Sequence, residues 1–355
     1  MMPTDENNEY QDTTPEEAAA AATPAEPVVP TPPVAATGDP KLARLARAVD
    51  EVRAELGKVI VGQAEFVELL IAALFAGGHV LVEGVPGIAK TLTAKLLAQT
   101  LHVDFNRIQF TPDLMPSDVV GTTVFNMQAS GFSFHPGPIF SNVVLIDEIN
   151  RAPAKTQAAL FEVMEENQVT VDGTTHLLGF PFFVIATQNP IEQEGTYKLP
   201  EAQLDRFLVK INIDYPSLAE EQAILRRFRS DFRMTQQKDV KPVLDAKAIR
   251  ECQTIVEEVF IQDELLDYIA RIVFETRQNG DLFLGASPRA SLAIMRMGKA
   301  IAAMNGREFV TPDDIQQVAY PVLNHRIILT PEREMEGFAT RDVIEEIIKK
   351  IVVPR

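Results

Sequence analysis

The segment that most constrains this 355-residue chain is a short glycine-containing turn between a predicted strand, 79–83, and a predicted helix, 92–101. A phosphate chain is neutralised by inward-pointing backbone N–H groups and by a helix N-terminus. A lysine in such a turn reaches the β- and γ-phosphates, and a neighbouring hydroxyl is a ligand for Mg²⁺. The turn therefore predicts a phosphate-binding site made of Gly84, Val85, Pro86, Gly87, Ile88, Ala89, Lys90 and Thr91.

Ala89 stands where the usual pattern of this turn has glycine. We expect the departure to be mild, because this position enters the helix and alanine favours helical geometry. With either small residue allowed there, chance matching in a chain of this length is roughly one in thirty from average composition. The turn alone thus leaves open a plain strand–turn–helix connection.

A second predicted strand, 143–146, ends in two carboxylates, Asp147 and Glu148. Mg²⁺ is a hard cation that prefers oxygen ligands, so Asp147 is expected to hold it directly or through water. Glu148 points elsewhere and can polarise a water that attacks the γ-phosphate. The alternative, in which the two acids only cap a helix, is disfavoured by the phosphate-binding turn upstream.

Three more residues are candidates for contact with the reacting phosphate. Asn189 follows a predicted strand and can position the lytic water through an uncharged amide, although an asparagine before proline is also common in turns. Arg206 lies between a short helix and the last predicted strand, and Arg289 lies in the first turn of a later helix. A guanidinium at a helix start suits phosphate contact, but on the bare sequence arginines in such positions are more often surface or salt-bridge residues.

The order of the predicted elements indicates an α/β fold. Short apolar runs alternate with helical stretches, which is typical of a parallel sheet covered on both faces. Two further stretches predict hairpins, 123–134 and 168–177, the second around the strong turn signal Asp172-Gly173. The strands are predicted at 79–83, 105–110, 143–146, 182–186 and 209–213.

Beyond residue 215 the strand signals stop, and residues 216–355 are expected to be all-helical. Ser217 and Glu220 form a plausible capping box, and Ser-Pro or Thr-Pro pairs mark later helix starts. At the other end, residues 1–40 contain eight Pro and eight acidic residues without any Lys or Arg. That composition predicts a disordered acidic Pro/Ala-rich tail, either a solvated spacer or a docking segment.

Charge and cysteine content exclude several function classes. The net charge of −17 argues against binding nucleic acid or an anionic membrane through surface charge. The single cysteine, Cys252, rules out an internal disulfide and a cysteine-based metal cage. The chain also lacks a secretory signal and a membrane-length apolar run, so we expect a cytoplasmic protein without direct membrane insertion.

Three motifs, in this order and spacing, resemble the MoxR family of AAA+ ATPases. They are the turn with its alanine, the segment Arg-Ile-Gln-Phe-Thr-Pro-Asp-Leu-Met-Pro-Ser-Asp at 107–118, and Asp-Glu-Ile-Asn-Arg-Ala at 147–152. The resemblance covers about Lys41 to the C-terminus. It implies a P-loop AAA+ core over 41–215, with a parallel sheet, flanking helices and two hairpin insertions, followed by a helical lid domain over 216–355.

The resemblance also implies a role for each candidate residue, with ATP and Mg²⁺ as the bound species. Arg206 would be an arginine finger inserted into a neighbouring subunit's site, which implies a homo-oligomeric ring, most often a hexamer. Arg289 would be the second sensor, acting either in cis or in trans. The segment Val59–Gln63 would pack near adenine. The remaining roles are phosphate and metal binding by Lys90 and Thr91, metal binding by Asp147, catalytic base for Glu148, and first sensor for Asn189.

The resemblance further implies a chaperone-like motor that uses ATP hydrolysis to remodel or mature partner proteins. Members of the family typically act with a protein that carries a von Willebrand factor A domain. One alternative is a DNA-directed AAA+ ATPase, a helicase or transcription activator. The acidic body and the lack of a basic run count against it. Another is a nucleotide-gated scaffold with little turnover, which the intact set of candidate catalytic residues disfavours.

Overall fold

The computed structural model describes residues 39–127, 130–189, 196–229 and 239–354, and a five-stranded parallel sheet separates its two apolar cores. Its strand order is β2–β5–β8–β1–β9. Every residue of β5 is buried, as expected of a strand covered on both faces. The predicted parallel sheet is confirmed. Its strands are β1 (Val80–Gly84), β2 (Phe105–Gln109), β5 (Val143–Asp147), β8 (Phe183–Gln188) and β9 (Val209–Ile213).

Apolar side chains fill a core on each face of this sheet, because successive residues of a strand point to opposite faces. In β5, Val143 and Leu145 belong to the larger core, whereas Val144 and Ile146 belong to the smaller one. The larger core continues into the C-terminal helices. The helices and the short 3-10 helix η1 of this half are α1 (Pro40–Gly57), α2 (Ala64–Phe75), α3 (Lys90–Thr100), α4 (Pro116–Val120), η1 (Ile149–Arg151), α5 (Ala154–Glu166) and α6 (Glu201–Leu204).

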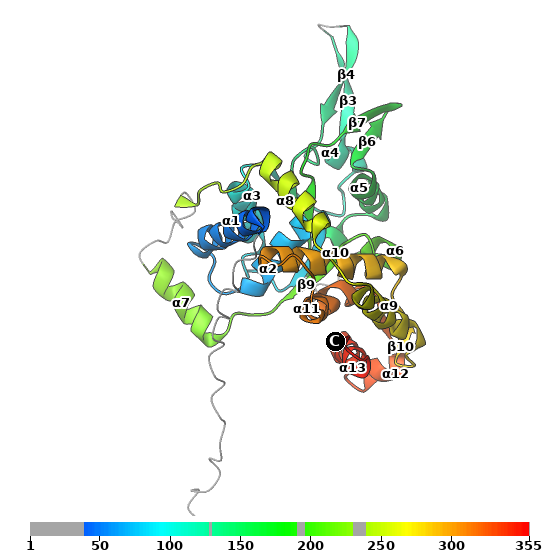
Figure 1. Cartoon of the computed structure of the whole chain (residues 1–355). Helices are drawn as coiled ribbons and strands as arrows, with labels where there is room; N and C mark the ends of the chain where they lie inside the picture. The colour runs from blue at the N-terminus through cyan, green and yellow to red at the C-terminus, as the bar shows by residue number, and fades with distance from the viewer. Residues whose placement is uncertain (1–38, 128–129, 190–195, 230–238, 355) are drawn as a thin grey trace, which may run out of the picture. The chain divides into compact units, whose positions relative to one another are not determined.

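Both predicted hairpins are present. They are β3–β4 (Gly121–Asn126 and Gly131–Pro136) and β6–β7 (Gln168–Val171 and Thr174–Leu177). Asp172 and Gly173 both have positive φ, as the predicted two-residue turn requires. The hairpins lie side by side, since the rings of Phe134 and His176 stack with centroids 4.0 Å apart (Figure 1). Part of the predicted turn of the first hairpin, 128–129, lies outside the described residues, as does 1–38 of the predicted tail.

The C-terminal region is helical, as predicted, with α7 (Leu218–Phe228), α8 (Ala246–Glu258), α9 (Asp263–Gln278), α10 (Pro288–Met304), α11 (Pro312–Leu323), α12 (Pro331–Met335) and α13 (Thr340–Lys350). Ser287, Thr311 and Thr330 are the N-caps of α10, α11 and α12, each followed by proline. The expectation that this region is all-helical needs one correction. Strands β10 (Leu282–Leu284) and β11 (Ile328–Leu329) form a short antiparallel pair. They are too short to show a periodicity of two in the sequence, and they pair across a long stretch of chain.

In the part of the chain that the structure describes, no helix combines the length and the apolarity needed to cross a bilayer.

Candidate functional site

The loop Gly84–Thr91, called here the glycine loop, connects the end of β1 to the start of α3. A Cβ on Gly84 would lie 2.7 Å from the Ile213 carbonyl oxygen, so a larger residue would push apart β1 and β9. Gly87 has φ +87°, and no atom lies within 4 Å of a Cβ placed on it. The loop is thus tightly packed at its base and open at its tip, where a ligand can approach the backbone. The Lys90 ammonium donates to the Gly84 carbonyl over 2.6 Å and so curls back over the loop.

Ala89 corrects one sequence-based expectation. It does not enter α3 with helical geometry but is the N-cap, in the left-handed conformation with φ 60° and ψ 21°. A residue with a side chain pays about 1–2 kcal/mol for this conformation, which glycine adopts freely. The expected reason for tolerating alanine is therefore wrong. The loop accepts the strain, because the turn into α3 needs a positive φ at this position.

The side chains of Thr91 and Asp147 meet at the carboxyl edge of the sheet, where metal ligands are predicted. The Thr91 hydroxyl lies 3.4 Å from Asp147 Oδ2. The Arg107 Nε is closer to that oxygen, at 2.6 Å, and the Thr187 hydroxyl donates to Asp147 Oδ1 over 3.0 Å. Among the described residues no group of three acidic, histidine or cysteine side chains could hold a metal. Mg²⁺ bound to a triphosphate needs only one or two protein oxygens besides phosphate and water, so this pair fits it.

Glu148 lies directly after β5 and has an unusual backbone. Its φ is 58°, in the left-handed region, which non-glycine residues adopt mostly where the surrounding structure imposes it, often at functional sites. Its carboxylate accepts from Gln109 Nε2 over 2.7 Å and lies 3.0 Å from Arg151 Nε. Its backbone N–H donates to the Thr187 hydroxyl over 3.1 Å. The Thr187 hydroxyl, which also binds Asp147, therefore holds Glu148, the candidate base, beside the candidate metal ligand Asp147.

Asn189 follows β8 and is 7% exposed. Because β8 lies between β5 and β1, its carboxyl end brings Asn189 between the two acids and the glycine loop. The predicted residues Lys90, Thr91, Asp147, Glu148 and Asn189 thus share one edge of the sheet.

The segment before α2, predicted to pack near adenine, is linked to the same edge. Gln63 Nε2 donates to the Ile88 carbonyl of the glycine loop over 2.7 Å. Gly62 and Gln63 both have positive φ, so the chain turns sharply just before α2 begins. This segment therefore lies against the loop and can form one wall of a nucleotide site.

The two candidate arginines lie at the opposite edge of the sheet. Val80 pairs with Val209 at the start of the parallel strands β1 and β9, and Gly84 pairs with Ile213 at their end. Arg206 precedes β9, so it lies at the amino edge, whereas the glycine loop begins at the carboxyl edge. At about 3.3 Å per residue, the length of β1 separates the two edges by about 13 Å.

Arg206 and Arg289 share one partner, Glu165, in the last turn of α5. Arg206 Nη1 lies 2.5 Å from Glu165 Oε2, and Arg289 Nη2 lies 2.9 Å from Glu165 Oε1. All three line a polar hollow of about 350 Å³. His79 and Phe182, which precede β1 and β8, line the same hollow, which confirms its position at the amino edge.

A partly buried network links the two arginine-bearing segments to each other. Asp205 Oδ2 accepts from the Ser287 hydroxyl over 2.9 Å, and Asp205 Oδ1 accepts from Arg326 Nε over 2.7 Å. Asp205 precedes Arg206, and Ser287 is the N-cap of the helix that begins with Pro288 and Arg289. The backbone positions of both candidate arginines are therefore set by one carboxylate.

His79 ties the end of α5 to the sheet at this edge. Its Nδ1 accepts from the Val184 N–H, so its Nε2 carries the proton and donates to the Met164 carbonyl, each over 3.1 Å. Burial, together with the positive charge of Arg296, lowers the pKa of His79 to about 4. The imidazole is therefore neutral, and the hollow's positive charge comes from its arginines.

Sequence reasoning gave no role to Arg107, Gln109, Glu165 and Thr187, although all four contact predicted site residues. Arg107 and Gln109 lie two residues apart on β2, so their side chains point to the same face of the sheet, and Gln109 pairs with Asp147 at the end of β5. Their spacing of two residues was a signal, once β2 is known to neighbour β5. Glu165 had no such signal, because a glutamate near the end of an amphipathic helix is typical of a solvated face.

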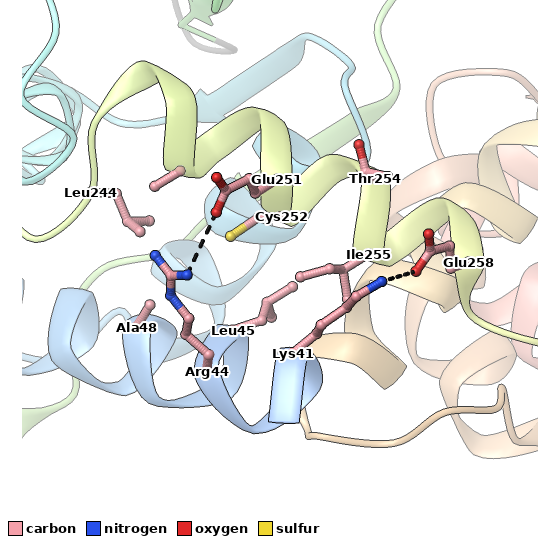
Figure 2. Close-up of a pocket in the computed structure, with 11 residues that line it drawn as sticks. Lys41, Arg44, Leu45, Ala48, Leu244, Glu251, Cys252, Thr254, Ile255 and Glu258 are labelled. Atoms are coloured by element: carbon pink, nitrogen blue, oxygen red, sulfur yellow. Dashed lines mark hydrogen bonds and ion pairs between the residues drawn. The ribbon is translucent and has the colours of Figure 1, made fainter. Parts of the chain in front are cut away.

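A second hollow, of about 290 Å³, lies between α1 and α8 and contains none of the predicted site residues (Figure 2). Ion pairs cross its opening, from Lys41 to Glu258 at 3.2 Å and from Arg44 to Glu251 at 3.7 Å. Cys252 lines its apolar wall, and burial raises the pKa of this thiol to about 11. Cys252 is thus a packed, protonated side chain.

A family model described as the ATPase family associated with various cellular activities (AAA) matches residues 79–209, and an AAA lid domain model matches 274–347. These ranges contain the glycine loop, both acids, Asn189 and both arginines.

Two relatives and one solved structure are similar over most of the chain. Chaperone MoxR1 from Mycobacterium tuberculosis is 42% identical over 320 residues, which cover 88% of this chain and 82% of that protein. Uncharacterized protein YeaC from Bacillus subtilis is 46% identical over 310 residues, 87% of this chain and 95% of that protein. A crystal structure of a candidate ATPase from Cytophaga hutchinsonii matches with a TM-score of 0.82 and 44% identity, over 89% of this chain and 97% of that one.

Proposed function

The chain belongs to the MoxR family of AAA+ ATPases, and on this premise we propose that it hydrolyses ATP to ADP and phosphate in sites shared between neighbouring protomers of a ring. Each site combines the carboxyl edge of one protomer's sheet with the amino edge of the next. The observation that carries the proposal is that the phosphate-binding and arginine-bearing halves lie at opposite edges of one sheet.

The carboxyl edge supplies binding and water activation. The glycine loop and the N-terminus of α3 hold the phosphates, and Lys90 exchanges its Gly84 carbonyl for phosphate oxygens. Thr91 and Asp147 hold Mg²⁺, which when bound neutralises charge on the β- and γ-phosphates. Glu148 takes a proton from the attacking water, and the Asn189 amide orients that water. Val59–Gln63 packs against adenine, since Gln63 is already bonded to the loop.

The amino edge supplies positive charge to the neighbour. Arg206 is the arginine finger, and because Arg289 shares Glu165 with it, we assign Arg289 to the same neighbouring site rather than to its own. Phosphoryl transfer depends mainly on alignment and charge neutralisation, and a finger of this type contributes about 10³ to 10⁵ in turnover. Closure of such sites around a circle requires a homo-oligomeric ring, for which we propose a hexamer.

The output of hydrolysis is remodelling or maturation of a protein client, with a von Willebrand factor A domain protein as the expected partner. The paired hairpins are the candidate contact surface. Phe125, Met127 and Phe132 of the first hairpin are 50%, 86% and 77% exposed. Neither hairpin, 121–136 or 168–177, contains Lys or Arg, so they suit contact with protein rather than with a phosphate backbone. The chaperone name of one relative supports this direction.

Steady-state release of phosphate by the full chain, in ATP with Mg²⁺, tests the proposal. We expect turnover that requires Mg²⁺, and we expect Lys90→Ala to abolish both nucleotide binding and turnover. Lys95→Ala, in the same helix, is the matched control and should retain activity. Unchanged ATP binding in Lys90→Ala would contradict the assignment of the glycine loop.

A further inference from the structure

Among the described residues, Glu165 is the one carboxylate that forms ion pairs with both proposed arginines. Its two oxygens are divided between them, one for Arg206 and one for Arg289. Arg206 also donates to the Phe161 carbonyl, one turn earlier in α5. In an isolated protomer, both guanidinium groups are therefore held against the end of α5.

The surroundings fix where this carboxylate sits. The residue before it, Met164, accepts through its carbonyl from His79, which precedes β1. Asp205, the other acid that lines the hollow, is already bonded to Arg326 and Ser287. Arg296, the remaining cation there, donates to the carbonyls of Ala76 and Gly77. Glu165 is thus the charged group that both arginines must leave before they can bind another anion.

We propose that Glu165 is a positioning residue that holds Arg206 and Arg289 in a resting arrangement until the triphosphate of a neighbouring protomer replaces its carboxylate. This inference rests on the proposed function, because it concerns the same shared site. A carboxylate and a phosphate cannot accept from the same N–H groups of one guanidinium. Two anions at hydrogen-bonding distance from the same arginine would also repel each other. Docking of the neighbour's ATP therefore displaces Glu165.

The exposure of the three side chains makes this exchange possible. The side chains of Arg206, Glu165 and Arg289 are 29%, 39% and 52% exposed. Ion pairs of such exposure are weak, because water competes with them, so they can be broken during each cycle. A triphosphate carries more negative charge than one carboxylate and can bind both arginines. Glu165 consequently raises the protein concentration at which neighbouring protomers form complete sites. It does not lower the turnover of a complete site.

The test compares Glu165→Gln with Glu166→Gln, an exposed glutamate one residue further along α5. Specific ATPase activity of the full chain is measured against protein concentration, which separates assembly of the shared site from maximal turnover. For Glu165→Gln we expect half-maximal activity at about fivefold lower protein concentration, the scale of an exposed ion pair, with maximal turnover within about twofold of wild type. Glu166→Gln should match wild type in both quantities.

A conservative variant and a finger variant complete the set. Glu165→Asp keeps the charge but is too short to bridge both arginines as Glu165 does, so its midpoint should fall between those of wild type and Glu165→Gln. Glu165→Asp also tests the inference if Glu165→Gln fails to fold. Arg206→Ala should lose turnover at every protein concentration, and its failure to do so would count against the shared site itself. The inference is overturned if Arg206→Ala is inactive while Glu165→Gln keeps the wild-type midpoint, or if Glu165→Gln loses turnover as Arg206→Ala does.

Discussion

Arg326 and Asp205 form a buried ion pair, with Arg326 Nε 2.7 Å from Asp205 Oδ1 and side chains 3% and 18% exposed. Burial lowers the pKa of Arg326, and the charge of Asp205 opposes that shift. Arg326 also donates to the carbonyls of Phe207 and Leu208. The pair therefore fastens the segment that carries Arg206 to the C-terminal region.

Asp205→Asn should lower the free energy of unfolding by about 3 kcal/mol, because it leaves a buried guanidinium without its counter-charge. Chemical denaturation of wild type and variant measures the change. Glu345→Gln, which removes an exposed ion pair with Lys349, should cost less than about 1 kcal/mol. Equal small losses in the two variants would show that the buried pair does not fix this segment.

Mixing two inactive variants should restore turnover. Arg206→Ala keeps an intact glycine loop, and Lys90→Ala keeps an intact finger, so a mixed ring contains some complete sites. We expect activity well above the sum of the separate proteins, as measured by phosphate release. If co-assembly is demonstrated and no activity returns, the two halves do not form one site.

Glu148→Gln should bind ATP but hydrolyse it at least about a hundredfold more slowly. The base that activates water is lost, while Asp147, the proposed ligand of Mg²⁺, remains. Nucleotide binding and single-turnover hydrolysis measure the two effects. A protein that copurifies with this variant in ATP, and does not copurify with Lys90→Ala, would identify the client. Wild-type turnover in Glu148→Gln would remove this residue from the proposed role.

Ala89→Gly should stabilise the protein. The substitution relieves left-handed strain of about 1–2 kcal/mol, while the added freedom of glycine in the unfolded chain costs roughly 0.5–1 kcal/mol. The net gain in the free energy of unfolding is therefore expected to lie between about 0 and 1.5 kcal/mol, measured by denaturation without nucleotide. Destabilisation would mean that the methyl group of Ala89 contributes more by packing than its backbone strain costs.

Stability should fall as the pH decreases from about 6.5 to about 4, in part because of His79. The folded-state pKa of His79, about 4, lies below its ordinary value of 6.5, so the unfolded chain binds the proton first in this range. Its contribution is fully present above pH 6.5 and is lost as the pH falls, by on the order of 3 kcal/mol in total. His79→Asn should flatten the slope over this range in denaturation curves. An unchanged slope would show that His79 does not remain neutral in the fold.

Much of the fold followed from local patterns. The bounds of β9 were predicted correctly, because the β-branched residues Val209, Ile211 and Ile213 alternate with polar ones. The caps at Ser287 and Thr311 were also predicted, since a hydroxyl before proline at the first helical position is a local signal. The pair β10–β11 was missed, because strands of two or three residues gain their stability from a distant partner rather than from their own sequence.

The same division holds for the site. The sequence by itself determined the residue types that bind phosphate and magnesium, because Lys90, Thr91 and Asp147 lie in short contiguous motifs whose chemistry is local. Only the tertiary structure decided that Arg206 and Arg289 lie together at the far edge of the sheet, with Glu165 between them. Strand order, strand direction and the packing of α5 set that arrangement. These depend on burial of apolar surface over the whole domain, which no short motif encodes.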